Sequence, residues 1–455
     1  MRSPRHRVAW LWMMAAVLCS TVDICRADVP DPDEIDLSTP QGFMAGIGFD
    51  ESYYKMFDDE QPLIDAEQEP LIRLLSRIRR PKPRQIEGWL QIEPKWGAYV
   101  EQPEASRLEC FLLVGRVVKI SSRPIFPELG AAYDLEDFYA LEVIPRGGET
   151  GSVERVVLMS LAIPERFKPL VDQEEGAIDQ PISAAAYFVK RMTPAGEQPA
   201  TIAAVTQRVS WHPDQVDAQL GVNEGQVLLA AQGVDIGEFD AIRDRAPFSG
   251  RENESFYQTQ AAVASVPRDQ LSAEATPVSL PRLLTEPEQF RGAAMRVRGM
   301  VRRITKIVVD EETARRRGLD HYYEINLFVP LKAPIISQAH GDPTTRREFE
   351  NSYPVVLCSR QLPPGGSVAD DLHLTVVAEG FFYKDWAYRS PFMSDEDPNR
   401  RQVSPLFIVD RPQTIEDSST GEVNSIAVWL LIFAVLASSL GIGAGVMLAG
   451  SRKRR

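Results

Sequence analysis

The chain has 455 residues, a formal net charge of −14 and four cysteines. Once the terminal segments described below are set aside, about 395 residues remain, enough for two or three domains. The acidic balance disfavours polyanions as partners, because like charges repel. Two of the cysteines, Cys110 and Cys358, lie beyond the first 27 residues, each in an apolar strand-like run. We expect both to be buried free thiols.

Residues 1–27 have the pattern of a cleavable signal peptide. A basic start is followed by an apolar core over residues 8–18 and a small-residue cleavage site that ends at Ala27. The apolar core is too short to span a bilayer. The sequence therefore predicts an exported protein.

Residues 28–100 are interpreted as an acidic arm followed by an amphipathic helix. Residues 28–62 are acidic and interrupted by prolines, which predicts disorder or an extended arm. From Gln68 to Arg80, leucine and isoleucine recur every three or four residues, with arginines on the other face. This spacing predicts a helix that packs on the domain after it.

Five β-rich segments then occur twice in the same order, over residues 101–210 and 281–411. Gly115 and Gly299 lie within the opening segments, and a tyrosine, Tyr139 or Tyr323, opens the next segment 24 residues after each glycine. The fourth segments are aromatic runs, Ala186–Met192 and Gly380–Tyr388. The order of these segments indicates an internal duplication of a mainly β domain.

Each copy is predicted to form a small antiparallel barrel. About five strands in some 110 residues, separated by turn residues, suit such a barrel or a sandwich, and a glycine within the opening strand favours the barrel, because it suits a strand that bends sharply. In strand count and glycine placement the copies are similar to an OB-type barrel. The second copy has about fifteen extra residues between Leu331 and Tyr353, and a long loop on a rigid barrel can be a binding loop or a decoration.

Residues 211–280 are interpreted as a helical connector between the barrels. A short helical face is expected from Ile236, Phe239 and Ile242, and a second helix over Asn253–Val263. Charge is uneven along the chain: residues 28–280 hold 23 basic against 42 acidic residues, and residues 281–411 hold 19 against 18.

The C-terminus is predicted to anchor the protein in a membrane. A linker over 412–424 precedes an apolar segment, 425–450, that is long enough to cross a bilayer, and 451–455 form a basic tail. The positive-inside rule places this tail in the cytoplasm and the bulk of the chain in the periplasm. Small residues recur every four positions in the span and could pair two helices into a homodimer: Ala437, Gly441, Gly445 and Ala449.

Catalysis finds little support in the sequence. The histidines lack the paired spacing of zinc sites, and neither a phosphate loop nor a nucleophile elbow is present. We therefore expect no enzyme, metal or cofactor. We do not expect nucleic acid to be a partner of an exported, acidic chain, although Lys384, Arg302, Arg303 and Arg315–Arg317 could supply positive charge.

The favoured interpretation is a single-pass inner-membrane protein whose exported tandem barrels act as a scaffold or protein-interaction module. Its expected partners are the bilayer and other envelope proteins. The alternative is a periplasmic protein that binds a glycan or small ligand through aromatic residues of the second barrel. For that alternative the candidate ligand-binding residues are Trp386, Tyr388 and Lys384, because aromatic rings stack on sugars.

Overall fold

The structure is a computed structural model that describes residues 36–146, 153–174, 176–197, 199–337, 347–389 and 401–415. Within these ranges no helix has both the length and the apolar character needed to cross a bilayer. The signal peptide, the predicted span with its small-residue stripe, and the basic tail lie outside the described residues. The chain divides into two compact units, 1–162 with 184–208, and 163–183 with 209–455.

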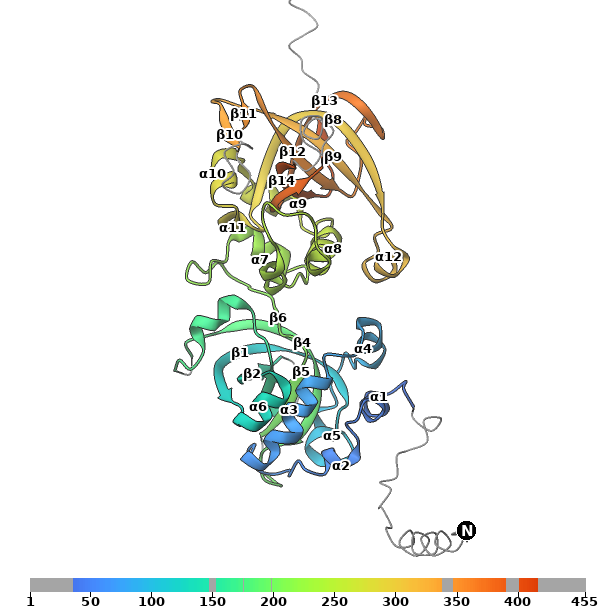
Figure 1. The fold of residues 1–455 in the computed structure, drawn as a ribbon, viewed down its shortest axis with the longest axis vertical. Helices are drawn as coiled ribbons and strands as arrows, with labels where there is room; N and C mark the ends of the chain where they lie inside the picture. Colours follow the sequence, from blue (N-terminus) through green and yellow to red (C-terminus); the bar gives the residue numbers. More distant parts are fainter. Residues whose placement is uncertain are drawn as a thin grey trace, which may run out of the picture. The chain divides into compact units, whose positions relative to one another are not determined.

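Up to Trp211 the chain forms, in order, α1 (Pro40–Gly46), α2 (Glu51–Tyr54), η1 (Asp65–Glu67), α3 (Gln68–Arg77), α4 (Pro83–Trp89), α5 (Trp96–Glu101), β1 (Cys110–Pro124), α6 (Pro127–Tyr133), β2 (Asp137–Pro145), β3 (Val153–Ser160), η2 (Glu165–Leu170), β4 (Gln180–Arg191), β5 (Ala200–Thr206) and β6 (Ser210–Trp211) (Figure 1).

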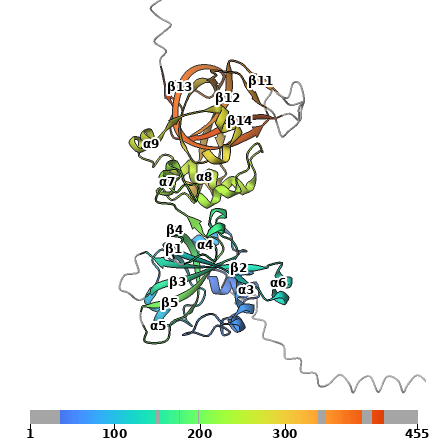
Figure 2. The same ribbon diagram turned by 90° about the vertical axis from the view of Figure 1, so that its left-hand side faces the viewer.

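The second barrel and its preceding helices comprise α7 (Glu224–Ala230), η3 (Ile236–Ala241), η4 (Gly250–Glu252), α8 (Asn253–Ala262), α9 (Arg268–Glu274), β7 (Thr276–Pro277), α10 (Leu280–Thr285), α11 (Pro287–Phe290), β8 (Ala294–Val308), α12 (Glu311–Arg317), β9 (His321–Pro330), β10 (Ile335–Ser337), β11 (Arg347–Phe349), β12 (Ser352–Ser359), β13 (Ala369–Tyr388), β14 (Gln402–Val409) and β15 (Gln413–Thr414) (Figure 2).

Both sheets close into near-barrel rings of five strands with the same topology. The first runs β1-β2-β3-β5-β4 and closes through β1 and β4; the second runs β8-β9-β12-β14-β13 and closes through β13 and β8. β3 pairs with β5 and β12 with β14 in parallel, so the prediction of purely antiparallel barrels is wrong for one pair in each ring. The pairings β1–β2, β2–β3 and β4–β5, and β8–β9, β9–β12, β13–β14 and β8–β13, are antiparallel. The predicted duplication into tandem OB-like barrels is therefore confirmed at the level of architecture.

The glycine within each opening strand allows the neighbouring strand to approach closely. A Cβ on Gly115 would lie 2.4 Å from the carbonyl oxygen of Ile144, and one on Gly299 would lie 2.5 Å from that of Phe328. Both contacts are with backbone, which a side-chain rotation cannot relieve. The glycines recognised in the sequence thus mark a close approach between neighbouring strands in each ring.

Gly299→Ala is accordingly expected to destabilise the second unit by about 1–3 kcal/mol through overpacking. Gly88→Ala is the matched control, because Gly88 lies in α4 with no atom within 4 Å of its added Cβ. The control should be neutral or slightly stabilising. Urea unfolding of both variants measures the difference, and equal stability of the two would contradict the close-approach explanation.

In each repeat a helix covers the outer face of the sheet. Helix α3 packs Leu71 and Leu75 into one core with Phe138 of β2 and Met159 of β3. The second barrel has its own interior core, to which β8, β9, β12, β13 and β14 all contribute. Outside that core, α8 places the ring of Phe256 5.4 Å from that of Tyr322 on β9.

The helices before the two barrels belong to the duplication as well. α3 and α8 are both ten residues long and begin 185 positions apart, and the same offset relates α4 to α9. Asp50 is the N-cap of α2 and Asp235 the N-cap of η3, and each accepts a hydrogen bond from the amide two residues on. The repeated unit is therefore a set of helices together with a barrel.

A buried lysine–glutamate pair joins helix to barrel in each repeat. Lys190 on β4 binds Glu67, just before α3, at 2.6 Å; Lys384 on β13 binds Glu252, just before α8, at 2.8 Å. All four side chains are at most 1% exposed. Both lysines follow the β-bulge of their strand, so the same irregularity directs both side chains toward the helix.

An aspartate and an arginine form a second repeated contact. Asp59 binds Arg107 at 2.9 Å, and Asp244 binds the side chain of Arg291 at the matching place. The same aspartates accept the backbone N–H of Arg191 and of Asp385, both at 2.9 Å. Each aspartate thereby holds an arginine, three positions before the opening strand, beside the fourth strand.

The prediction of a disordered or extended arm is wrong for residues 36–62. This stretch forms α1 and α2, and Met44, Phe49 and Phe57 are buried in the core with α3. Its acidic residues serve as caps and ion-pair partners, which composition alone does not reveal. The helices expected at 68–80 and 253–263 are confirmed as α3 and α8, and Ile236, Phe239 and Ile242 are buried.

Residues 163–183 were predicted to belong to the first barrel domain, over residues 101–210, and this assignment is wrong. They follow β3 in the chain, yet they belong to the unit that contains the second barrel. Phe167 packs edge-on against Trp211 at 5.2 Å, and the amide of Glu165 donates to Asp240 at 2.8 Å. Cys110 and Cys358 are buried free thiols, as predicted.

Candidate functional site

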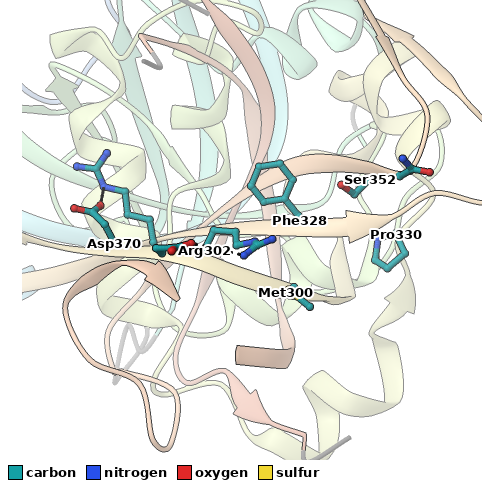
Figure 3. Close-up of a pocket in the computed structure, with 9 residues that line it drawn as sticks. Met300, Arg302, Phe328, Pro330, Ser352 and Asp370 are labelled. Carbon is teal, nitrogen blue, oxygen red and sulfur yellow. Dashed lines mark ion pairs between the residues drawn. The ribbon is translucent and has the colours of Figure 1, made fainter. Parts of the chain in front are cut away.

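The second barrel has a pocket of about 740 Å³ on the outer side of its first strands. β8, the end of β9 and the starts of β12 and β13 contribute its lining. Figure 3 shows Met300, Phe328 and Pro330 with Arg302, Ser352 and Asp370 around this pocket.

The apolar part of the pocket is a cross-strand pair. Met300 on β8 stands opposite Phe328 on β9 in the antiparallel register. Their side chains are 38% and 37% exposed, although each belongs to a type that is usually buried. Pro330 extends this surface at the end of β9. The pocket can therefore accept an apolar group from a ligand.

Two arginines with aspartate partners form the polar side. Arg303 Nε lies 3.0 Å from Asp370, and Arg302 lies 3.8 Å from Asp371 and also contacts the His373 ring. The aspartates are 82% and 89% exposed, and the arginines 50% and 41%. Water thus reaches both pairs, so neither holds its arginine strongly.

An irregularity at the start of β13 places these aspartates. Asp370 pairs with Arg303 and Leu374 with Val301, so residues 371–373 stand opposite Arg302 alone. Asp371 has a left-handed backbone conformation with φ of 59°. Bulges redirect side chains and are frequent beside binding sites, and positive φ in a residue other than glycine concentrates at such sites too.

The pocket lies where the second barrel differs from the first. By alignment of the two glycines, Val118 and Lys119 take the places of Arg302 and Arg303. β13 has 20 residues where β4 has 12, and the extra ones include the bulge. The extra residues predicted between Leu331 and Tyr353 connect β9 to β12 in the second barrel. Pro330, Asn351 and Ser352, at the two ends of this connection, line the pocket.

Helix α8 limits what the rest of this sheet face can bind. The Gln260 side chain donates to the carbonyl of Cys358 on β12 at 3.2 Å, and Tyr383 on β13 packs on Phe256. Burial raises the pKa of the Cys358 thiol well above its usual value. The strand surface on which OB-type barrels bind oligomers is thus covered by helix at the β12 end.

The three residues predicted to bind a ligand lie elsewhere on β13. Lys384 is completely buried on Glu252, which leaves its amino group unavailable to a ligand. Trp386 and Tyr388 are half-buried and stack on each other, with ring centroids 4.6 Å apart. Burial raises the pKa of Tyr388 to about 12. None of the three lines the pocket.

Sequence reasoning considered Arg302 and Arg303 only as a source of charge for nucleic acid, and it missed Met300, Phe328, Asp370 and Asp371. The insertion was the available signal, because its two ends lie at the pocket. Among the described residues no cluster of three or more histidine, cysteine, aspartate or glutamate side chains could hold a metal ion. The pocket lining is suited to recognition through apolar contact and ion pairing.

No protein family and no curated protein sequence matches the chain. Similar solved structures include a single-stranded DNA-binding protein from Thermus aquaticus, 8% identical, covering 69% of this chain and 96% of that one, with a TM-score of 0.15. An aspartyl-tRNA synthetase from Entamoeba histolytica is 12% identical, with coverages of 55% and 53% and a TM-score of 0.16. Fission yeast Pot1 with single-stranded DNA is 10% identical, with coverages of 79% and 97% and a TM-score of 0.16. At TM-scores this low, the likenesses carry no argument about fold or function.

Proposed function

We propose that this protein is a membrane-anchored interaction protein of the cell envelope, whose second barrel binds a partner protein through the Met300–Phe328 pocket. The observation that carries the proposal is that the features by which the second barrel differs from the first lie together at one pocket. The arginines, the bulge and the insertion that distinguish the second barrel all meet at this pocket. The first barrel, which lacks them, then serves as scaffold.

The composition of the pocket favours a protein partner. Methionine, phenylalanine and arginine are enriched at protein–protein interfaces, and methionine adapts its shape to different partners. The glycan alternative has less support, since Trp386 and Tyr388 stack on each other and Lys384 is buried. Export and membrane anchoring remain part of the proposal on the strength of the two terminal sequence patterns.

A photo-crosslinking amino acid at Phe328 tests this function in the full chain in native membranes. We expect it to capture a defined envelope protein, identified by mass spectrometry. Val308 provides the matched control, because it is 76% exposed on β8 and does not line the pocket. The same crosslinks from both positions, or none from Phe328, would count against the proposal.

A further inference from the structure

The basic side chains of the pocket point to the chemistry of its partner. Strand β8 carries five basic residues and no acidic one between Ala294 and Val308. Among the described residues that line the pocket, the acidic partners of Arg302 and Arg303 are the highly exposed Asp370 and Asp371. Since guanidinium groups match carboxylates in shape as well as charge, the arginines are suited to bind carboxylates.

The aspartates can leave the arginines at little cost. Exposed ion pairs contribute about 0–1 kcal/mol each, because water solvates the separated charges. A partner carboxylate that arrives together with apolar contact would displace them, since it brings additional burial on Met300 and Phe328. The bulge holds Asp370 and Asp371 where such ligand carboxylates would lie.

We infer that the pocket recognises a polypeptide segment in which carboxylates flank an apolar side chain, with Asp370 and Asp371 occupying the arginines while the segment is absent. This inference rests on the proposed function and specifies the partner of the same site. The apolar side chain packs between Met300 and Phe328, and its acidic neighbours replace the aspartates on Arg302 and Arg303. The aspartates are then intramolecular competitors of the partner.

A peptide-display experiment tests this inference. Random twelve-residue peptides on phage are selected on the full-length chain in nanodiscs, and the binders are retained that lose binding to Phe328→Ala. We expect them to share aspartate or glutamate next to a large apolar residue. Selected peptides without acidic residues would overturn the inference and leave the proposed function standing, whereas failure of the Phe328 crosslink concerns the function itself.

The affinities of the selected peptides for variants provide the second measurement. Arg302→Gln with Arg303→Gln should weaken binding at least about tenfold, as expected for lost charged hydrogen bonds. Asp370→Asn with Asp371→Asn should strengthen binding about three- to tenfold by removing the competitors. Lys306→Gln removes a charge from the same strand outside the pocket and should change affinity less than about twofold.

Two results would contradict the inference, the first for the competitor role of the aspartates and the second for the role of the apolar pair. If Asp370→Asn with Asp371→Asn weakened binding, the aspartates would contact the peptide directly. If polyglutamate bound as tightly as the selected peptides, charge alone would account for recognition and the apolar pair would have no part in it. Thermal unfolding of each variant, compared with the parent chain, identifies any loss of binding that is caused by loss of structure.

Discussion

Glu252→Gln is expected to lower the free energy of unfolding of the second unit by about 3–5 kcal/mol, because it leaves the buried Lys384 ammonium without its counter-ion. Burial lowers the pKa of Lys384 even with Glu252 beside it, because the buried ammonium is poorly solvated. Urea unfolding followed by hydrogen exchange of β13 and β14 measures the loss. The first unit retains its own pair and should be unaffected.

A double variant distinguishes the loss of stability caused by an unpaired buried charge from the stability that the ion pair itself contributes. Glu252→Leu combined with Lys384→Met replaces both charges by apolar groups of similar size, and such replacements are often neutral or stabilising. The double variant should therefore be more stable than Glu252→Gln. If Glu252→Gln costs less than about 1 kcal/mol, the pair is not the link between helix and barrel that its burial implies.

Asp385→Asn is expected to stabilise the second unit at pH 8 and to have little effect below pH 4. Burial, together with the nearby Asp244, raises the pKa of Asp385 to about 7. Both of its carboxylate oxygens lack a hydrogen-bond partner among the described residues. The side chain is also fully buried, so its ionised form is costly.

The sign of this pH dependence follows from the raised pKa. An unfolded aspartate has a pKa of about 3.9, so the folded chain binds this proton more tightly. Stability contributed by the protonated form is therefore present at low pH and is lost as pH rises from about 4 to about 7. A difference of about three pKa units corresponds to at most about 4 kcal/mol.

Urea unfolding of the parent chain and Asp385→Asn across pH 4 to 8 checks this expectation. The variant should follow a flatter stability profile over that range. The groups that face Asp385 are Asp244, Arg245 and Arg291. Asp244→Asn should lower the pKa of Asp385 toward its usual value, although it also removes the partner of Arg291. Parallel pH profiles for the parent and Asp385→Asn would contradict a titrating Asp385.

The barrels were predictable because their strands carry a strong pattern. Alternating apolar residues and the two aligned glycines survive in both copies, so the duplication is visible in the sequence. The helical half of the repeat was not recognised, because α3 is rich in leucine whereas α8 is mostly polar and buries Ser255 and Gln260. A constant spacing of 185 residues was nevertheless present, linking Asp50 to Asp235, Asp59 to Asp244 and Glu67 to Glu252.

The pocket was harder to predict because it depends on register. An aromatic run such as Gly380–Tyr388 is conspicuous, yet the bulge after Phe382 directs Lys384 into the protein. Asp370 and Asp371 carry no local signal; only the pairing of β13 with β8 brings them to Arg303 and Arg302. Residues that meet through long-range strand pairing leave little trace in a single sequence.

Residues 163–183, which follow β3 in the chain but belong to the unit of the second barrel, determine where the chain can be divided and the order in which its parts can fold. Because this segment belongs to the second unit while β3 and most of β4 belong to the first, no single cut separates the two. Within this segment Phe167 packs on Trp211 and Glu165 donates to Asp240, and both partners are synthesised later. During synthesis from the N-terminus, the segment between β3 and β4 can therefore form these contacts only after residues of the second unit have been synthesised.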